Sequence, residues 1–193
     1  MLYLIGIDHL IQYENDIVPG DTFLEFKAFL EETAVNHNIS LMAEEFSEES
    51  LFDVYNSPEG TVKSVALKLG IEHMYCDPEE GDRKKLGIPY FAEIERKVKN
   101  KYNIRDKFII DNSLRKKVYS ETVKLSKTYW PIREIFWYEK ILHMLNENIL
   151  FICGHEHINS FGSLLSEKGY TTKIIDPFWK KSLFSDYGKL RLK

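Results

Sequence analysis

The fold of this chain is decided by Ile149-Leu150-Phe151-Ile152-Cys153-Gly154-His155-Glu156-His157, an apolar run that ends in a glycine and two histidines. The same pattern occurs near the other end of the chain, in Leu2-Tyr3-Leu4-Ile5-Gly6-Ile7-Asp8-His9. Short apolar runs bounded by turn residues are typical of strands buried in a parallel sheet. Two such strands would bring both Gly-x-x-His turns to the carboxyl edge of one sheet, where ligands bind in open α/β folds.

Strand and helix patterns alternate along the rest of the chain. Strands are predicted at 2–8, 39–46, 71–77, 148–155 and 170–175. Helices are predicted at 21–34, 60–69, 89–102, 131–145 and 159–168, and 103–129 is expected to be helical and basic. Strand–helix–strand units cross over right-handedly and build a parallel sheet. We therefore predict a single α/β domain over 1–193, with a mainly parallel central sheet and helices on both faces.

The composition is that of a folded, non-membrane protein. Hydrophobic residues make up 44% of the chain, and no apolar stretch approaches the roughly 20 residues that span a bilayer. Residues 1–7 run directly into Asp8-His9 without a basic leader, so we expect a strand there and not a signal peptide. Cys76 and Cys153 lie in predicted buried strands, as reduced core thiols of a cytoplasmic protein do.

Charge is distributed unevenly along the chain. Residues 1–82 contain 18 acidic and 3 basic side chains, a net charge of −15. Residues 83–133 contain 15 basic and 5 acidic side chains, a net charge of +10. We favour the interpretation that the two segments pack together and neutralise each other. The alternative is a basic surface that binds nucleic acid or an acidic partner.

Histidines follow both glycine turns and are the first candidate site residues. His155 and His157 lie two positions apart, so both would face the same side of extended backbone. The helix expected at 159–168 would point its amino terminus at this turn, which favours an anion or a developing oxyanion. His9 has the same setting after the first strand. Because imidazole binds metals and transfers protons at neutral pH, the two turns predict one shared site.

Carboxylates end the second and third predicted strands. Glu44 and Glu45 are consecutive, and since neighbouring strand residues point to opposite faces, only one of them can face a shared site. Asp77 lies at the matching edge. A carboxylate there can bind a metal or act as a general base. Arg133 begins a helix, where a cation is unfavourable, so we expect a carboxylate or a substrate oxyanion beside it.

In order along the chain, these residues resemble the TraB/TIKI family, within the wider erythromycin-esterase-like and ChaN-like superfamily. Members have an amino-terminal strand that ends in Gly-x-x-His and a second strand that ends in glutamate. An arginine on a later helix and a second Gly-x-x-His follow. The matching positions are Gly6 to His9, Glu44 or Glu45, Arg133-Glu134 and Gly154 to His157, and the likeness continues from Leu164 to Tyr170.

The resemblance implies a metal-dependent, peptidase- or esterase-like hydrolase that acts on a small-molecule or peptide substrate. One divalent ion (Mn, Co or Zn) would be bound by His9 and His157, with a glutamate, Glu44, as a further ligand. Asp77 is a candidate ligand of the same ion because it lies at the matching edge of the predicted sheet. The ion would lower the pKa of its bound water toward 7.

The catalytic residues expected with this ion are a glutamate, Glu44 or Glu45, as general base, together with Arg133 and His155. Arg133 and the helix amino terminus would stabilise the developing negative charge.

Other functions are consistent with the same residues. Esterases of the superfamily use a histidine base without a metal, and ChaN-like proteins bind haem. Gly154-His155-Glu156-His157 also looks like the Gly-His-x-His of calcineurin-like metallophosphoesterases, although their other motifs are absent. A third alternative is a non-catalytic binding module that uses the basic 83–133 segment. P-loop, Gly-x-Ser-x-Gly and His-Glu-x-x-His motifs do not occur.

Overall fold

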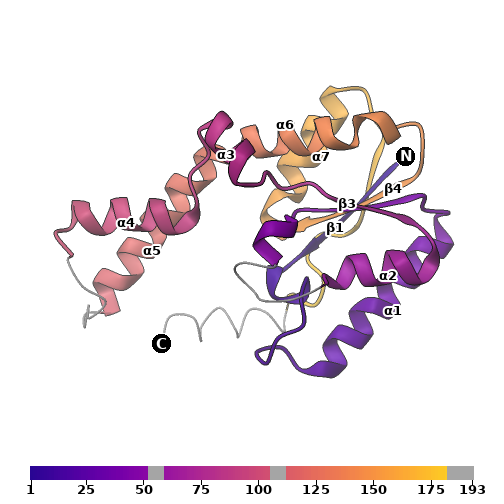
Figure 1. The fold of residues 1–193 in the computed structure, drawn as a ribbon, viewed down its shortest axis with the longest axis horizontal. Coiled ribbons are helices and arrows are strands. Elements are labelled where there is room, and N and C mark those ends of the chain that lie inside the picture. The colour runs from indigo at the N-terminus through magenta and orange to yellow at the C-terminus, as the bar shows by residue number, and fades with distance from the viewer. Residues whose placement is uncertain (52–58, 105–111, 182–193) are drawn as a thin grey trace.

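The computed structural model describes residues 1–51, 59–104 and 112–181. At its centre is a sheet of five parallel strands in the order β3-β2-β4-β1-β5 (Figure 1). Each strand overlaps its predicted range, which confirms the α/β fold with a parallel central sheet. The strands are β1 (Leu2–Ile7), β2 (Leu41–Glu44), β3 (Glu72–Tyr75), β4 (Ile149–Gly154) and β5 (Thr172–Asp176).

Helices cover both faces of the sheet. Side chains alternate between the two faces along each strand, so each face carries apolar side chains that the helices bury. Ile5 and Ile7 of β1 pack in one core with α1 (Gly20–Asn36) and α2 (Thr61–Leu69). Leu4 belongs to a second core with α6 (Trp130–Ile141) and α7 (Ile158–Glu167). The predicted helix stripe of α1 is buried in the first core: Phe23, Phe26, Leu30 and Ala34.

Short 3-10 turns join several of these elements. The two Gly-x-x-His turns continue as η1 (His9–Ile11) and η5 (His155–His157), and η5 leads directly into α7. η3 (Lys127–Tyr129) precedes α6, and η4 (Leu142–Met144) follows it. Among the described helices, none combines the length and the apolar character that a membrane crossing requires.

Two helices extend to one side of the sheet and cover neither face (Figure 1). α4 (Phe91–Lys101) packs against α5 (Asn112–Ser126), and these helices bury Ile94, Val98 and Val118. We call α4 and α5 the arm. A short helix that the sequence did not predict, α3 (Glu80–Leu86), precedes it. Of the predicted 103–129 helix, residues 105–111 lie outside the described part of the chain.

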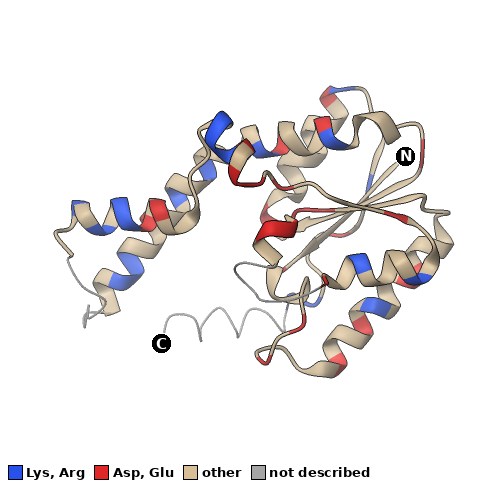
Figure 2. Ribbon diagram, in the orientation of Figure 1, with Lys and Arg blue, Asp and Glu red and all other residues tan. Residues whose placement is uncertain are grey.

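The arm separates much of the basic segment from the acidic first half of the chain. Lysines and arginines are spread along α4 and α5, away from the sheet (Figure 2). Several pair within the arm, as Lys99 does with Glu95 and Lys101 with Glu121. The expected neutralisation of the two segments is found where Arg83 and Arg133 bind acidic residues beside the sheet. Among the described ion pairs, none joins α4 or α5 to residues 1–82, because these two helices pack mainly on each other.

Candidate active site

The carboxyl ends of the strands meet at one edge of the sheet, and the candidate residues gather there. β1 and β4 are neighbours in the sheet, with Gly6 opposite Cys153 and Ile7 opposite Gly154. The two Gly-x-x-His turns that follow these strands therefore lie side by side. The position of two elements almost 150 residues apart in sequence is thus set by one strand pairing.

Glycine suits both turns because neighbouring atoms occupy the space where a Cβ would lie. A Cβ on Gly154 would lie 2.8 Å from His9 Nε2, and a Cβ on Gly6 would lie 2.1 Å from the carbonyl oxygen of Pro177. A larger residue fits at neither position unless a neighbour moves. The glycine of the second turn thus makes room for the histidine of the first.

Glu45, directly after β2, is the centre of the site. Its Oε1 accepts a hydrogen bond from Arg133 Nη2 at 2.6 Å, and its Oε2 accepts one from the backbone N–H of Gly154 at 2.8 Å. The Nε2 atoms of His157 and His9 lie 3.5 and 3.7 Å from Oε1. One buried carboxylate therefore connects β2 with both histidine turns and with α6.

Burial by itself would raise the pKa of Glu45, but its neighbours outweigh this effect. Arg133, His157, His9 and the N–H of Gly154 all stabilise the carboxylate, and they lower its pKa from 4.5 to about 2. The site therefore contains a carboxylate that stays ionised at neutral pH. A group with so low a pKa is a poor general base.

Arg133, in the first turn of α6, links Glu45 to Asp77. Its Nε and Nη2 donate to Asp77 Oδ1 at 2.9 and 2.6 Å, and Trp137 Nε1 donates to the same oxygen at 3.2 Å. Arg83 Nη2 donates to Asp77 Oδ2 at 2.6 Å. Burial would lower the pKa of Arg133, but the two carboxylates raise it above its ordinary value. The carboxylate partner predicted for Arg133 is confirmed.

His157 is held by a second buried carboxylate. Its Nδ1 lies 2.7 Å from Glu134 Oε1, which also accepts a hydrogen bond from Ser160 at 2.6 Å. Trp130 and Trp137 pack on the imidazole, with ring centroids 4.2 and 4.9 Å away. Sequence reasoning gave Glu134 no separate role. The sequence could have indicated a role for Glu134, because positions 130, 134 and 137 lie on one face of a helix and Glu134 therefore lies between two tryptophans.

Glu44, the last residue of β2, does not join the Glu45 cluster. Its oxygens lie 2.9 Å from His73 Nε2 and 2.7 Å from Gln12 Nε2. Gln12 Oε1 in turn lies 2.6 Å from His9 Nδ1. Only Glu45 faces the shared site, as strand alternation predicts. Gln12 was missed, although it is a polar side chain among apolar residues just after the first turn.

His155 is placed apart from this cluster. Its ring stacks on Phe178, with centroids 3.7 Å apart and planes at 3°. Among the described contacts, none joins His155 to Glu45, His9 or Arg133. The two histidines of the second turn point differently because η5 bends the backbone, so the extended alternation that would align them does not apply.

The residues expected to bind a metal do not fit a divalent ion in this arrangement. Within the described residues, no group of three or more histidine, cysteine or acidic side chains is placed to hold one. His9 and His157 face Glu45, whose Oε1 already binds Arg133. Asp77 binds arginine through both of its oxygens. The guanidinium of Arg133 thus occupies the position where a cation would bind these carboxylates.

A cavity of about 710 Å³ opens onto these residues. Its floor includes His9, whose side chain is 44% exposed, beside the almost fully buried Glu45. The start of α4 forms another part of its wall, so the arm contributes to the same cavity. The lining residues are His9, Glu45, Phe46, Ser47, Ser50, Asp77, Arg83, Tyr90, Phe91, Ala92, Glu93 and Arg133.

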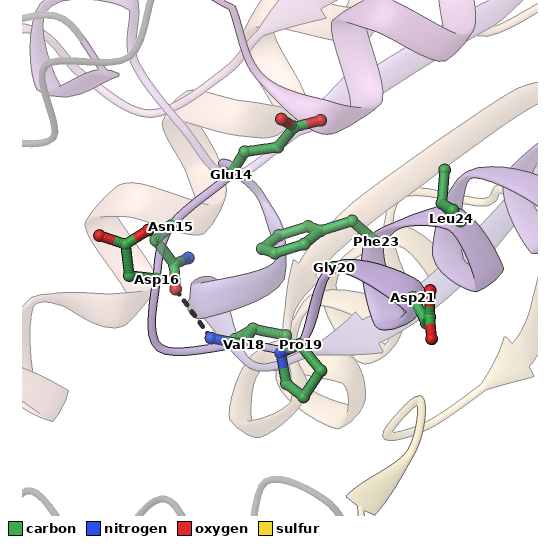
Figure 3. A pocket seen from close by; sticks show the side chains of 9 residues that line it. All are labelled: Glu14, Asn15, Asp16, Val18, Pro19, Gly20, Asp21, Phe23 and Leu24. Atoms are coloured by element: carbon green, nitrogen blue, oxygen red, sulfur yellow. Dashed lines mark hydrogen bonds between the residues drawn. The ribbon is translucent and has the colours of Figure 1, made fainter.

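A second hollow, of about 780 Å³, lies between the loop after η1 and the start of α1 (Figure 3). Glu14, Asp16 and Asp21 contribute carboxylates to its wall, and Phe23 contributes an aromatic ring. Asn15 Oδ1 shapes the loop by accepting a hydrogen bond from the N–H of Val18 at 3.1 Å. This hollow contains none of the residues predicted to form the site.

Comparisons with known proteins find no matching family model, no similar curated protein and no similar solved structure.

Proposed function

We propose that the protein is a hydrolase of small carboxylic esters in which His9 acts as the general base without a metal ion. One observation carries the proposal. His9 is the imidazole that lines the 710 Å³ cavity, and its Nε2 lies 3.7 Å from the ionised carboxylate of Glu45. An exposed imidazole beside a buried carboxylate is a common arrangement for proton transfer in hydrolysis.

His9 suits the role of base better than either glutamate does. Glu45 has a pKa of about 2 and holds a proton too weakly. Glu44 is fully buried and bonded to His73 and Gln12. Glu45 instead faces the positive charge that forms on His9 as it takes a proton, and so stabilises the imidazolium.

Arg133 is the group that stabilises the oxyanion. Its hydrogen bonds to described residues all run through Nε and Nη2, which leaves Nη1 for a ligand oxygen in the cavity. Asp77 and Glu45 fix the plane of the guanidinium before a substrate arrives. A preorganised cation at this position contributes to the rate because it needs no reorganisation in the transition state.

The reaction is then a simple acyl transfer to water. Water attacks the ester carbonyl carbon as His9 Nε2 removes its proton, and the carbonyl oxygen becomes an oxyanion beside Arg133. The tetrahedral intermediate collapses, the bond to the alkoxide breaks, and the His9 imidazolium gives its proton to the leaving oxygen. The products are a carboxylic acid and an alcohol, and His9 is again neutral.

The test is hydrolysis of 4-nitrophenyl butyrate by the purified protein, with EDTA or with added Mn²⁺, Co²⁺ or Zn²⁺. We expect turnover in EDTA, loss of about 10²-fold or more in kcat for His9→Ala, and no loss for His143→Ala, an exposed histidine on η4. Activity that requires a metal would support the metal-assisted hydrolase predicted from the sequence. Hydrolysis of bis-4-nitrophenyl phosphate alone would support the phosphoesterase instead, and either result would overturn the proposal.

The arm supports a second candidate function, the docking of a nucleic-acid or acidic partner. Lysines and arginines line α4 and α5 away from the sheet (Figure 2). Lys116 and Lys117 are exposed on α5. Binding of a short DNA duplex that weakens steeply with salt, and is lost in Lys116→Glu/Lys117→Glu, would support it. If binding is absent or does not depend on salt, the docking function is rejected and the hydrolase remains as the proposed function.

We further propose a cytoplasmic location and membership of the wider erythromycin-esterase-like superfamily to which the TraB/TIKI family belongs. The first is supported by Cys76 and Cys153, which are free, buried thiols. The second is supported by the order of residues that now meet at one edge of the sheet, namely His9, Glu45 and His157.

A further inference from the structure

Gln12, the only glutamine in the chain, lies at the end of η1 with its side chain fully buried. Both backbone polar groups of Gln12 form hydrogen bonds. The N–H donates to the carbonyl of His9 at 3.2 Å, and the carbonyl accepts from the N–H of Thr61 at 2.7 Å. The side chain thus starts from a fixed position between the first histidine turn and β2.

The orientation of the Gln12 amide is determined by its neighbours. One terminal atom lies 2.7 Å from Glu44 Oε2 and 3.4 Å from the carbonyl oxygen of Glu45. Both neighbours are acceptors, so this atom must be the NH₂ group. The opposite orientation would place the amide oxygen against a carboxylate oxygen in the interior, where an unsatisfied acceptor is costly.

The other end of the amide, Oε1, lies 2.6 Å from His9 Nδ1. An amide oxygen can only accept a hydrogen bond, so Nδ1 must carry the proton. A neutral imidazole protonated at Nδ1 has its lone pair at Nε2. That nitrogen lies 3.7 Å from Glu45 Oε1, and His9 and Glu45 both line the cavity.

His73 completes the arrangement on the far side of Glu44. Its Nε2 lies 2.9 Å from Glu44 Oε1, and its side chain is buried. Two side-chain nitrogens, Nε2 of His73 and Nε2 of Gln12, thus face the oxygens of the Glu44 carboxylate. An ionised carboxylate only accepts hydrogen bonds, and this sets the direction of the chain from His9 through Gln12 to Glu44.

We propose that Gln12 is a positioning residue: Glu44 orients its amide, and the amide holds His9 in the tautomer whose Nε2 can accept a proton from a molecule in the cavity. The inference rests on the proposed role of His9 as base. It assigns a function to Gln12, Glu44 and His73, none of which belongs to the Glu45 cluster.

The tautomer of His9 can be measured directly by long-range ¹H–¹⁵N NMR of the histidine rings at pH 8, with His9 assigned from the signals lost in His9→Asn. We expect a protonated Nδ1 and an unprotonated Nε2 in the native protein. An Nε2-protonated His9 would overturn the proposal, and this measurement needs no variant of Gln12 to fold. Glutamine-selective ¹⁵N labelling reports the Gln12 NH₂ group separately as one signal pair.

Two variants test whether the Gln12 amide sets the tautomer of His9. Gln12→Met keeps the volume and removes both hydrogen bonds, and Glu44→Gln lets the amide of Gln12 turn either way. In each we expect a mixture of His9 tautomers and a fall of about tenfold or more in kcat for 4-nitrophenyl butyrate, with KM little changed. A purely structural role would leave the tautomer unchanged, and that result would overturn the proposal.

These outcomes separate the proposal from the function on which it rests. If His9 is protonated at Nδ1 and loses this preference in Gln12→Met, but the native protein hydrolyses no ester, the hydrolase proposal fails and the positioning role stands. If His9→Ala abolishes hydrolysis while Gln12→Met keeps the native tautomer, the positioning role fails alone.

Discussion

At the scale of single residues, Glu45 is charged in the interior because other groups replace the water it loses. Arg133 and the N–H of Gly154 bind its two oxygens, and two imidazoles lie within 3.7 Å. Without these partners, an ionised carboxylate at this depth would take up a proton. The charge of Glu45 is therefore a property of the assembled site.

This pKa predicts how stability depends on pH. Because the folded value is about 2 and the ordinary value is 4.5, the stabilisation is fully present above about pH 5 and is lost as the pH falls toward 2. The loss should be about 3 kcal/mol in the free energy of unfolding. Urea unfolding at pH 5, 4, 3 and 2 should show a smaller loss in Glu45→Gln, and equal losses would contradict the assignment.

Arg133 should not be replaceable by lysine. Its planar guanidinium reaches Glu45 and Asp77 together, and a single ammonium cannot hold both carboxylates and still face the cavity. We expect Arg133→Lys to reduce kcat for 4-nitrophenyl butyrate by about 10²-fold, with a smaller change in KM. A lysine variant with native kcat would exclude Arg133 as the oxyanion group.

At the scale of elements, the strands could be predicted from the sequence, but the close approach of the two Gly-x-x-His turns could not. Apolar runs bounded by turn residues mark β1 and β4, and both are buried throughout. The apolar pattern predicts their burial on both faces, whereas their pairing as neighbours is seen only in the sheet. The close approach of the two turns is different, because it depends on how Gly154 packs against His9.

Two glycine substitutions should distinguish an effect on activity from an effect on the stability of the fold. In Gly154→Ala the new Cβ meets His9 Nε2 at 2.8 Å, so we expect a large loss of kcat. In Gly6→Ala it meets the Pro177 carbonyl at 2.1 Å, so we expect a loss of stability of about 2 kcal/mol or more.

Gly81→Ala is the matched control, because no atom lies within 4 Å of the added Cβ and the residue is inside α3. It should raise the free energy of unfolding slightly, by about 0.5–1 kcal/mol. Thermal unfolding and kcat measured on all three variants check the set. A fully active Gly154→Ala would show that His9 does not need its present position.

At the scale of the whole molecule, the arm matters because it forms part of the wall of the 710 Å³ cavity beside His9 and Glu45. Tyr90 and Phe91 line the cavity from the start of α4, and Phe91 lies near Tyr119 of α5, with ring centroids 6.3 Å apart. Phe91 remains 45% exposed, so a molecule in the cavity can reach its ring. The arm is thus expected to act on substrate binding more than on chemistry.

Phe91→Ala should therefore raise KM for 4-nitrophenyl butyrate by about tenfold, the effect of losing one apolar contact of 1–2 kcal/mol. kcat should change little, because among the described contacts none joins Phe91 to His9 or Arg133, the groups proposed to act on the reacting atoms. Leu125→Ala is the control, since Leu125 is an exposed apolar residue of α5 that does not line the cavity. A fall in kcat without a change in KM would contradict this role.

By itself, the sequence determined the parallel α/β fold and the edge at which its functional residues gather. Apolar periodicity and turn residues are local signals, and they place His9, Glu45, Asp77 and His157 at strand ends. Only the tertiary structure decided which groups face one another. Arg133 binds the carboxylates of Glu45 and Asp77, His155 stacks on Phe178, and Gln12 joins His9 to Glu44. These contacts join residues up to 88 positions apart, and side-chain direction at such contacts depends on packing that no local pattern encodes.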